Sequence, residues 1–141
     1  MYYVNRMQID MRLDQLPSIV DVLEQAAQRS TEDILHRFAG ERALHLAIEV
    51  VTDIGSYLID GFIMRDASSY EDIVEIIREE QVIDTETFEM LHDLVKQRRP
   101  LVQDYHIPAS QHTLDLPRLS IALQQFAVQV RRYLEKELAD F

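Results

Sequence analysis

The chain has 141 residues, of which 47% are apolar and 28% are charged, and this composition is globular rather than disordered. It contains no cysteine, which excludes disulfide bonds and thiolate metal ligands. Its net charge is −11, whereas a general nucleic-acid-binding protein carries an excess of Lys and Arg. Any contact with RNA has to come from a local basic segment. Two segments qualify, KQRR at 96–99 and Arg131-Arg132, and we expect Arg131-Arg132 to lie on a solvated helix face.

The amino-terminal stretch MYYVNRMQIDMRLD carries a charge by its sixth residue and has no long apolar run. We therefore expect neither a secretory signal nor a membrane-spanning helix, and a cytoplasmic location follows as the default. We expect residues 1–141 to form a single domain.

Apolar residues recur every three or four positions along most of the chain, which predicts helices and no strand. Pro17 should kink the first helical segment or begin a new helix capped by Asp14. The first expected helix covers residues 9–27, and the second starts within residues 30–33 and ends near Met64. The other expected helices cover 70–82, 84–99 and 118–141, and the expected loop is HIPASQHTLDLP at 106–117. Helices joined by short connections predict an antiparallel, up-and-down bundle of the four-helix type.

All three glycines, Gly40, Gly55 and Gly61, fall inside the predicted long helix. Each costs roughly 1 kcal/mol relative to alanine in a helix interior. We therefore expect the backbone to approach another helix closely there, either in the same chain or across a dimer interface.

One face of the long helix carries Glu41, His45, Glu49 and Asp53 at intervals of four residues. Carboxylates and an imidazole on one face are able to hold a divalent metal, but no second helix offers a matching pair of ligands. We expect hydrogen bonds and exposed charges instead, and we predict neither a metal nor a cofactor. The remaining isolated histidines receive no predicted role: His36, His92 and His112.

The segment KQRRPLVQDYH, at 96–106, is the strongest candidate for a catalytic or binding site in the chain. Pro100 disfavours helical geometry at Arg99, so the helix should be kinked or interrupted there. RNA cleavage without a metal needs a base for the 2′-hydroxyl and a cation for the developing charge on phosphate. Arginine supplies the cation and His106 could supply the base, whereas Gln103 can only form hydrogen bonds.

The order of ERALHLAIEVVTDIGSYLIDGFI, a short acidic helix and RRPLVQDY resembles the HepT-like ribonuclease toxin family, a branch of the HEPN superfamily. The segments IDGFIMRD and SYEDI are similar to the YutE-type subgroup, and the resemblance covers nearly the whole chain. The family hallmark is an arginine, usually followed by asparagine, then a catalytic histidine and often a tyrosine two residues further on. Arg98 matches the arginine and Tyr105 the tyrosine, but Arg99 replaces the asparagine and Gln103 replaces the histidine.

The resemblance implies a homodimer in which two motifs share one cleft, and RNA as the family substrate. It also implies a nucleotidyltransferase antitoxin as a partner, which in some members attaches AMP to the tyrosine that corresponds to Tyr105.

Two main interpretations remain open. The first is a catalytically degenerate, dimeric RNA- or protein-binding module, because Gln103 stands in the place of the motif histidine. The second is an active, metal-independent endoribonuclease that uses Arg98, Arg99 and a register-shifted His106. A metal-dependent enzyme on the Glu41–Asp53 face is a distant third.

Overall fold

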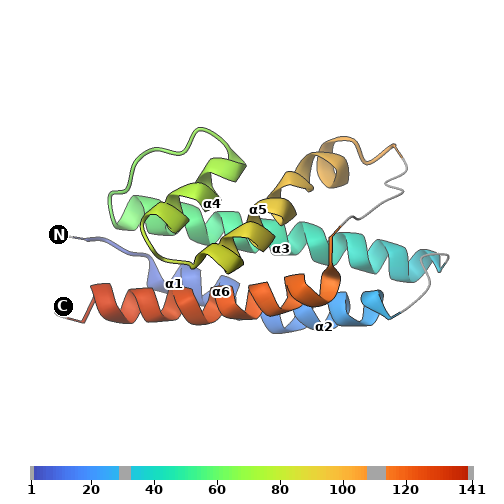
Figure 1. The fold of residues 1–141 in the computed structure, drawn as a ribbon, viewed down its shortest axis with the longest axis horizontal. Helices are drawn as coiled ribbons and strands as arrows, with labels where there is room; N and C mark the ends of the chain where they lie inside the picture. Colours follow the sequence, from blue (N-terminus) through green and yellow to red (C-terminus); the bar gives the residue numbers. More distant parts are fainter. Residues whose placement is uncertain (1, 29–32, 108–113, 140–141) are drawn as a thin grey trace.

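A computed structural model describes residues 2–28, 33–107 and 114–139, and these contain helices and no strand. The predicted helical bundle is confirmed (Figure 1). In chain order its elements are α1 (Arg6–Leu13), α2 (Leu16–Ala27), α3 (Ile34–Gly61), α4 (Tyr70–Glu79), α5 (Thr85–Lys96), a π-helical turn η1 (Arg99–Gln103) and α6 (Leu116–Glu137).

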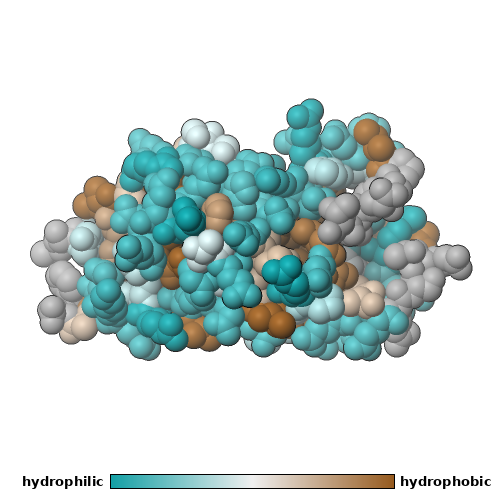
Figure 2. Space-filling view, in the orientation of Figure 1, coloured by the Kyte–Doolittle hydropathy of each residue, from teal (hydrophilic) through white to brown (hydrophobic). Residues whose placement is uncertain are grey.

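The long helix α3 is the axis of the bundle. Helix α2 packs between α3 and α6, while α4 and α5 cover α3 from the other side and α5 also contacts α6 (Figure 1). One cluster of buried apolar side chains joins these helices, and its largest fully buried member is Phe126 of α6. Hydrophilic side chains cover most of the face seen in Figure 2, with hydrophobic groups in small, separate areas.

The first predicted helix is broken into α1 and α2, with Pro17 in the first turn of α2. Proline is tolerated there because the amide of a first-turn residue has no partner within the helix. The prediction that Asp14 caps the second helix is wrong. Asp14 instead ends α1, where its backbone N–H donates to the carbonyl of Asp10 at 2.9 Å, and Gln15 occupies the cap position of α2 without a capping side-chain hydrogen bond.

Helix α3 is capped by Asp33, and it ends earlier than predicted. The Asp33 carboxylate accepts from the amide of Leu35 at 3.0 Å, while residues 30–32 lie outside the described residues. The helix ends at Gly61 rather than near Met64 because Ile63 adopts a left-handed φ of 56°. The amide of Met64 then donates back to the carbonyl of Ile59 at 2.9 Å, which closes the helix end.

Two of the three glycines make a close approach within the chain, but only Gly55 meets another helix as predicted. A Cβ at Gly55 would clash with the Cγ2 methyl of Ile73 in α4, so this side chain packs directly against the backbone of α3. A Cβ at Gly61 would lie 3.0 Å from the Cα of Val4, in the extended segment before α1. At Gly40 a Cβ would meet only the Cβ of Ala26 at 3.4 Å, which is an ordinary contact.

The last helix begins two residues before the predicted start. The Asp115 carboxylate caps α6 by accepting from the amide of Arg118 at 3.2 Å, and Pro117 lies in the first turn. The predicted loop therefore ends at the cap, and its residues 108–113 lie outside the described part of the chain.

Candidate functional site

The motif segment begins where α5 ends and the chain widens into the π-helical turn η1. The predicted interruption at Pro100 is confirmed, but it takes the form of a wider turn, in which the amide of Asp104 donates to the carbonyl of Arg99, five residues earlier, at 2.9 Å. Because proline lacks an N–H and its ring crowds the preceding turn, a π-type bulge relieves the conflict without ending the chain's helical path. Consecutive motif side chains consequently point in different directions.

Arg98 is the motif residue that the fold holds most firmly. Its Nε lies 3.4 Å from Oε1 of Glu49 on α3, and its Cζ lies 4.1 Å from the ring centroid of Tyr70, the first residue of α4. The side chain is 22% exposed. A carboxylate at Nε and an aromatic ring against the guanidinium face fix the plane of this group.

The outer edge of the same guanidinium faces no acceptor. Within the described residues, no side chain or backbone oxygen hydrogen-bonds to either Nη atom of Arg98. A guanidinium offers a fork of N–H donors that matches two phosphate oxygens. Arg98 is thus oriented by its inner nitrogen and its face, and its fork remains available to an anion.

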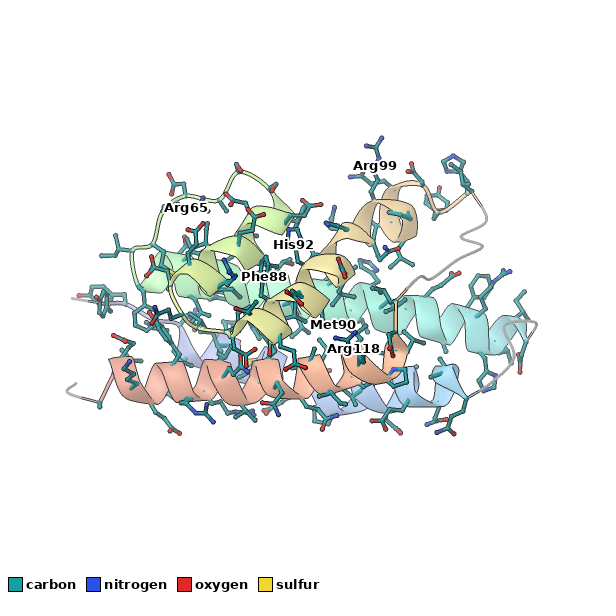
Figure 3. All side chains as sticks on the ribbon, in the orientation of Figure 1. Arg65, Phe88, Met90, His92, Arg99 and Arg118 are labelled. Carbon is teal, nitrogen blue, oxygen red and sulfur yellow. The ribbon has the colours of Figure 1, made fainter. Side chains whose placement is uncertain are left out.

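The other motif residues lie on the outside. Arg99 is 78% exposed, with Nε 3.6 Å from Oδ2 of Asp104, and Figure 3 shows its side chain pointing away from the bundle. Gln103 is also exposed. The Tyr105 side chain is 78% exposed, and its ring meets that of exposed His106 edge to face at 5.8 Å between centroids.

The structure does not bring His106 to either arginine. In the described part of the chain, no hydrogen bond or ion pair joins His106 to Arg98 or Arg99. A proton-transfer role for His106 would need the substrate to bridge the space between them.

The charged stripe of α3 forms separate contacts rather than a metal site. Glu41 faces Arg37 at 4.0 Å and Asp53 pairs with Arg12 at 3.0 Å, while His45 Nε2 and Arg98 Nε both approach Oε1 of Glu49. No group of three or more His, Asp or Glu side chains in the described ranges is placed to hold a metal ion.

Of the histidines without a predicted role, His36 hydrogen-bonds the Asp33 carboxylate at 2.7 Å, and this contact lowers the pKa of Asp33. His92 lies 3.3 Å from Glu75 across the α4–α5 contact, and its ring packs on Phe88 (Figure 3). His112 lies outside the described residues. Arg131 and Arg132 are exposed on α6, as predicted.

Sequence reasoning missed two members of the Arg98 site. Glu49 was expected to form a hydrogen bond or to lie exposed on the face it shares with His45, but the sequence did not indicate Arg98 as its partner. Tyr70 gave no sequence signal, because its contact with Arg98 depends on how α4 folds back onto the end of α5.

The helical bundle and the arginine motif after α5 place the protein in the HEPN-like class of small helical proteins. A family model described as "Ribonuclease HepT-like" matches residues 12–135. The curated Bacillus subtilis (strain 168) protein "Putative RNase YutE" is 35% identical over 139 residues, which cover 98% of this chain and 95% of that protein.

A solved structure gives the same result. The structure of YutE from Bacillus subtilis, described as a cytosolic protein of unknown function, superposes with a TM-score of 0.83 at 33% identity, covering 100% of this chain and 98% of the other. The chain therefore belongs to the HepT-like ribonuclease family, as its resemblance to the YutE-type subgroup predicted. None of its described helices is long and apolar enough to cross a membrane.

Proposed function

We propose that the protein is a dimeric, RNA-binding member of the HepT-like family that has lost the catalytic histidine of the motif. The observation that carries this proposal is the contrast between two motif positions. Arg98 is oriented by Glu49 and Tyr70 with its fork free, whereas Gln103 occupies the histidine position with a side chain that only forms hydrogen bonds. The motif thus keeps the arginine that would bind phosphate but lacks the histidine that would transfer the proton.

Dimerisation would strengthen such a site. In the family arrangement two motifs share one cleft, so each protomer would bring Arg98 and Arg99 to a common patch on an otherwise acidic surface. We further propose that residues 1–141 act as one helical domain. A cytoplasmic location is supported by the similarity to YutE from Bacillus subtilis, which is described as a cytosolic protein.

The test is an RNA cleavage and gel-shift assay in excess chelator, with total tRNA and messenger RNA as substrates. We expect the wild-type protein to shift RNA without cutting it, and Arg98→Ala to abolish the shift while sedimenting as a dimer. A wild-type protein that binds no RNA would overturn the proposal and favour a protein partner. A monomer in analytical ultracentrifugation would remove its dimeric part.

The alternative is an active, metal-independent endoribonuclease that uses Arg98, Arg99 and His106. It is favoured by the exposure of His106 in the turn that directly follows η1. In the same assay it predicts chelator-resistant cleavage that His106→Ala abolishes. Cleavage of equal rate in wild type and variant would assign the activity to another residue or to a contaminant.

We also propose that a nucleotidyltransferase antitoxin acts on this protein through Tyr105. The strong exposure of that side chain supports the proposal, because an AMP-transferring enzyme needs access to the phenolic oxygen. Co-expression with a small nucleotidyltransferase should give an AMP-modified peptide in mass spectrometry that Tyr105→Phe lacks. Modification retained in Tyr105→Phe would exclude this residue as the acceptor.

A further inference from the structure

Four charged or titratable side chains form a continuous row, three of them on α3 and the fourth just beyond the end of α5. Nη1 of Arg42 lies 3.2 Å from Nδ1 of His45, Nε2 of His45 lies 3.6 Å from Oε1 of Glu49, and Nε of Arg98 lies 3.4 Å from that same oxygen. We call Arg42, His45, Glu49 and Arg98 the Glu49 cluster. The side chains of His45 and Glu49 are about one-third exposed, so protons from solvent reach them.

The contacts of His45 fit one tautomer of a neutral ring. A guanidinium has only donors, so Arg42 donates to Nδ1, which must carry a lone pair. The ring is then neutral, and its one proton lies on Nε2, facing the Glu49 carboxylate. A second proton would have to bind at Nδ1. There it would place an N–H donor and a positive charge directly against Arg42.

Protonation of His45 therefore changes the cluster in two ways. With a neutral ring, two arginines and one carboxylate give the cluster a net charge of +1; with a protonated ring the net charge is +2. In addition, repulsion releases the Arg42 guanidinium from Nδ1 and frees its fork. Both changes favour an anion next to the open edge of Arg98.

We infer that His45 regulates phosphate binding at Arg98: protonation of its ring, transmitted through the shared Glu49 carboxylate and the release of Arg42, strengthens the binding of RNA. This inference rests on the proposed function, because it concerns the same RNA-binding site. It makes Arg42 a second phosphate-binding residue and makes His45 the residue that sets the pH range of binding.

The other described imidazoles contact groups outside the cluster: His36 faces Asp33, His92 of α5 faces Glu75, and His106 meets the Tyr105 ring. The remaining charged pair near the end of α5 is Lys96 with Asp93. The remaining neighbours on α3 are Arg37 and Glu41, which pair with each other; η1 offers Arg99, paired with Asp104; and α4 offers the Tyr70 ring. Arg12 of α1 is paired with Asp53. The charged side chains of α2 line the groove towards α6: Asp21 and Glu24.

The test is the affinity for a labelled single-stranded oligoribonucleotide, measured by fluorescence anisotropy from about pH 8 to pH 5.5 at constant ionic strength. One added positive charge near a phosphate should raise the wild-type affinity about threefold to tenfold as the pH falls. His45→Gln should bind with an affinity that does not change with pH. Arg42→Gln should lose most of the gain at low pH.

His36→Gln is the matched control, because His36 also pairs with a carboxylate on α3 but lies nine residues, or about 13 Å of helix, away from His45. It should keep the full pH dependence. An unchanged pH dependence in His45→Gln, or one that His106→Gln removes, would overturn the inference and leave RNA binding intact. A wild-type protein that binds RNA equally at all pH values would do the same, whereas no binding at any pH would overturn the proposed function as well.

Discussion

The close contact between Gly55 and Ile73 allows a mutational test in which the effect of Gly55→Ala on stability changes sign. Gly55 of α3 meets Ile73 of α4 so closely that an added Cβ would clash with the Cγ2 methyl, whereas the Ile73 Cβ would lie 3.8 Å away. Gly55→Ala gains about 1 kcal/mol in helix propensity. Overpacking costs about 1–3 kcal/mol. We therefore expect Gly55→Ala to lower the free energy of unfolding by about 1 kcal/mol.

Removal of the opposing methyl should convert this loss into a gain. Ile73→Ala alone should cost about 2 kcal/mol, at the low end for core truncation, because Ile73 is only partly buried. In that background the added Cβ at position 55 meets only the Cβ of residue 73, at an ordinary contact distance of 3.8 Å, so Gly55→Ala should stabilise by about 1 kcal/mol. The coupling energy between the two substitutions is then about 2 kcal/mol, which lies within the range measured for residues in contact.

Urea unfolding of the four proteins of the cycle measures this coupling, with Gly40→Ala as the matched control. A Cβ at Gly40 meets only Ala26 at 3.4 Å, so this variant should gain close to the full 1 kcal/mol. If Gly55→Ala stabilises as much as Gly40→Ala, or destabilises equally in both Ile73 backgrounds, the contact is not the cause. Tyr70, which packs against the Arg98 guanidinium, lies one turn before Ile73 in α4. Gly55→Ala should therefore also weaken RNA binding through Arg98.

Three further predictions concern the motif, a strained residue and acid stability. Gln103→His, which restores the motif histidine beside a preoriented Arg98, should create chelator-resistant RNA cleavage at least about a hundredfold above background; no cleavage by a folded variant that still binds RNA would mean that more than the histidine has been lost. Gln81, with φ 62°, should accept glycine with a gain of about 1 kcal/mol in thermal unfolding, and a loss would show that its side chain contributes more than its backbone costs. Arg65 hydrogen-bonds both carboxylate oxygens of Asp72 at 2.8 Å and lowers the pKa of that carboxyl. Because the pKa of Asp72 in the folded protein lies below its unfolded value of about 3.9, this pair stabilises the fold above that pH, and the effect is lost as the pH falls. Arg65→Gln should therefore have a lower free energy of unfolding than wild type at pH 7, and the difference between the two proteins should shrink below about pH 4. A difference that stays constant with pH would contradict the assignment.

The helical bundle and the interruption at Pro100 were predictable because both depend on local pattern. Period-three-and-four apolar residues define a helix wherever they occur, and a proline disturbs any helix that contains it. Even the close approach at Gly55 followed from a local cost that the fold had to offset. The new helix at Pro17 was predicted correctly, but its cap was placed one residue too early, at Asp14 instead of Gln15.

The site itself depends on contacts between residues far apart in sequence. Glu49 and Arg98 are 49 residues apart, and Tyr70 reaches Arg98 only because the α4–α5 hairpin folds back along α3. From the sequence alone, the Glu49 carboxylate is equally suited to a metal site and to a surface ion pair. Only the packing of α5 against α3 selects an arginine as its partner.

The net charge of −11 and the proposed RNA binding are compatible because electrostatic interactions in salt solution are short-ranged. At physiological ionic strength charges more than about 8 Å from a phosphate are largely screened, so the local arrangement at Arg98 matters more than the total. A dimer would bring Arg42, Arg98 and Arg99 from each protomer and neutralise up to about six phosphates, which predicts a log–log salt dependence no steeper than about −4 for single-stranded RNA. Anisotropy titrations over a series of salt concentrations at fixed pH measure this slope. A markedly steeper value would mean that RNA also follows a second basic surface, for which exposed Arg131 and Arg132 on α6 are the candidates, and Arg132→Gln would then reduce the slope by about one.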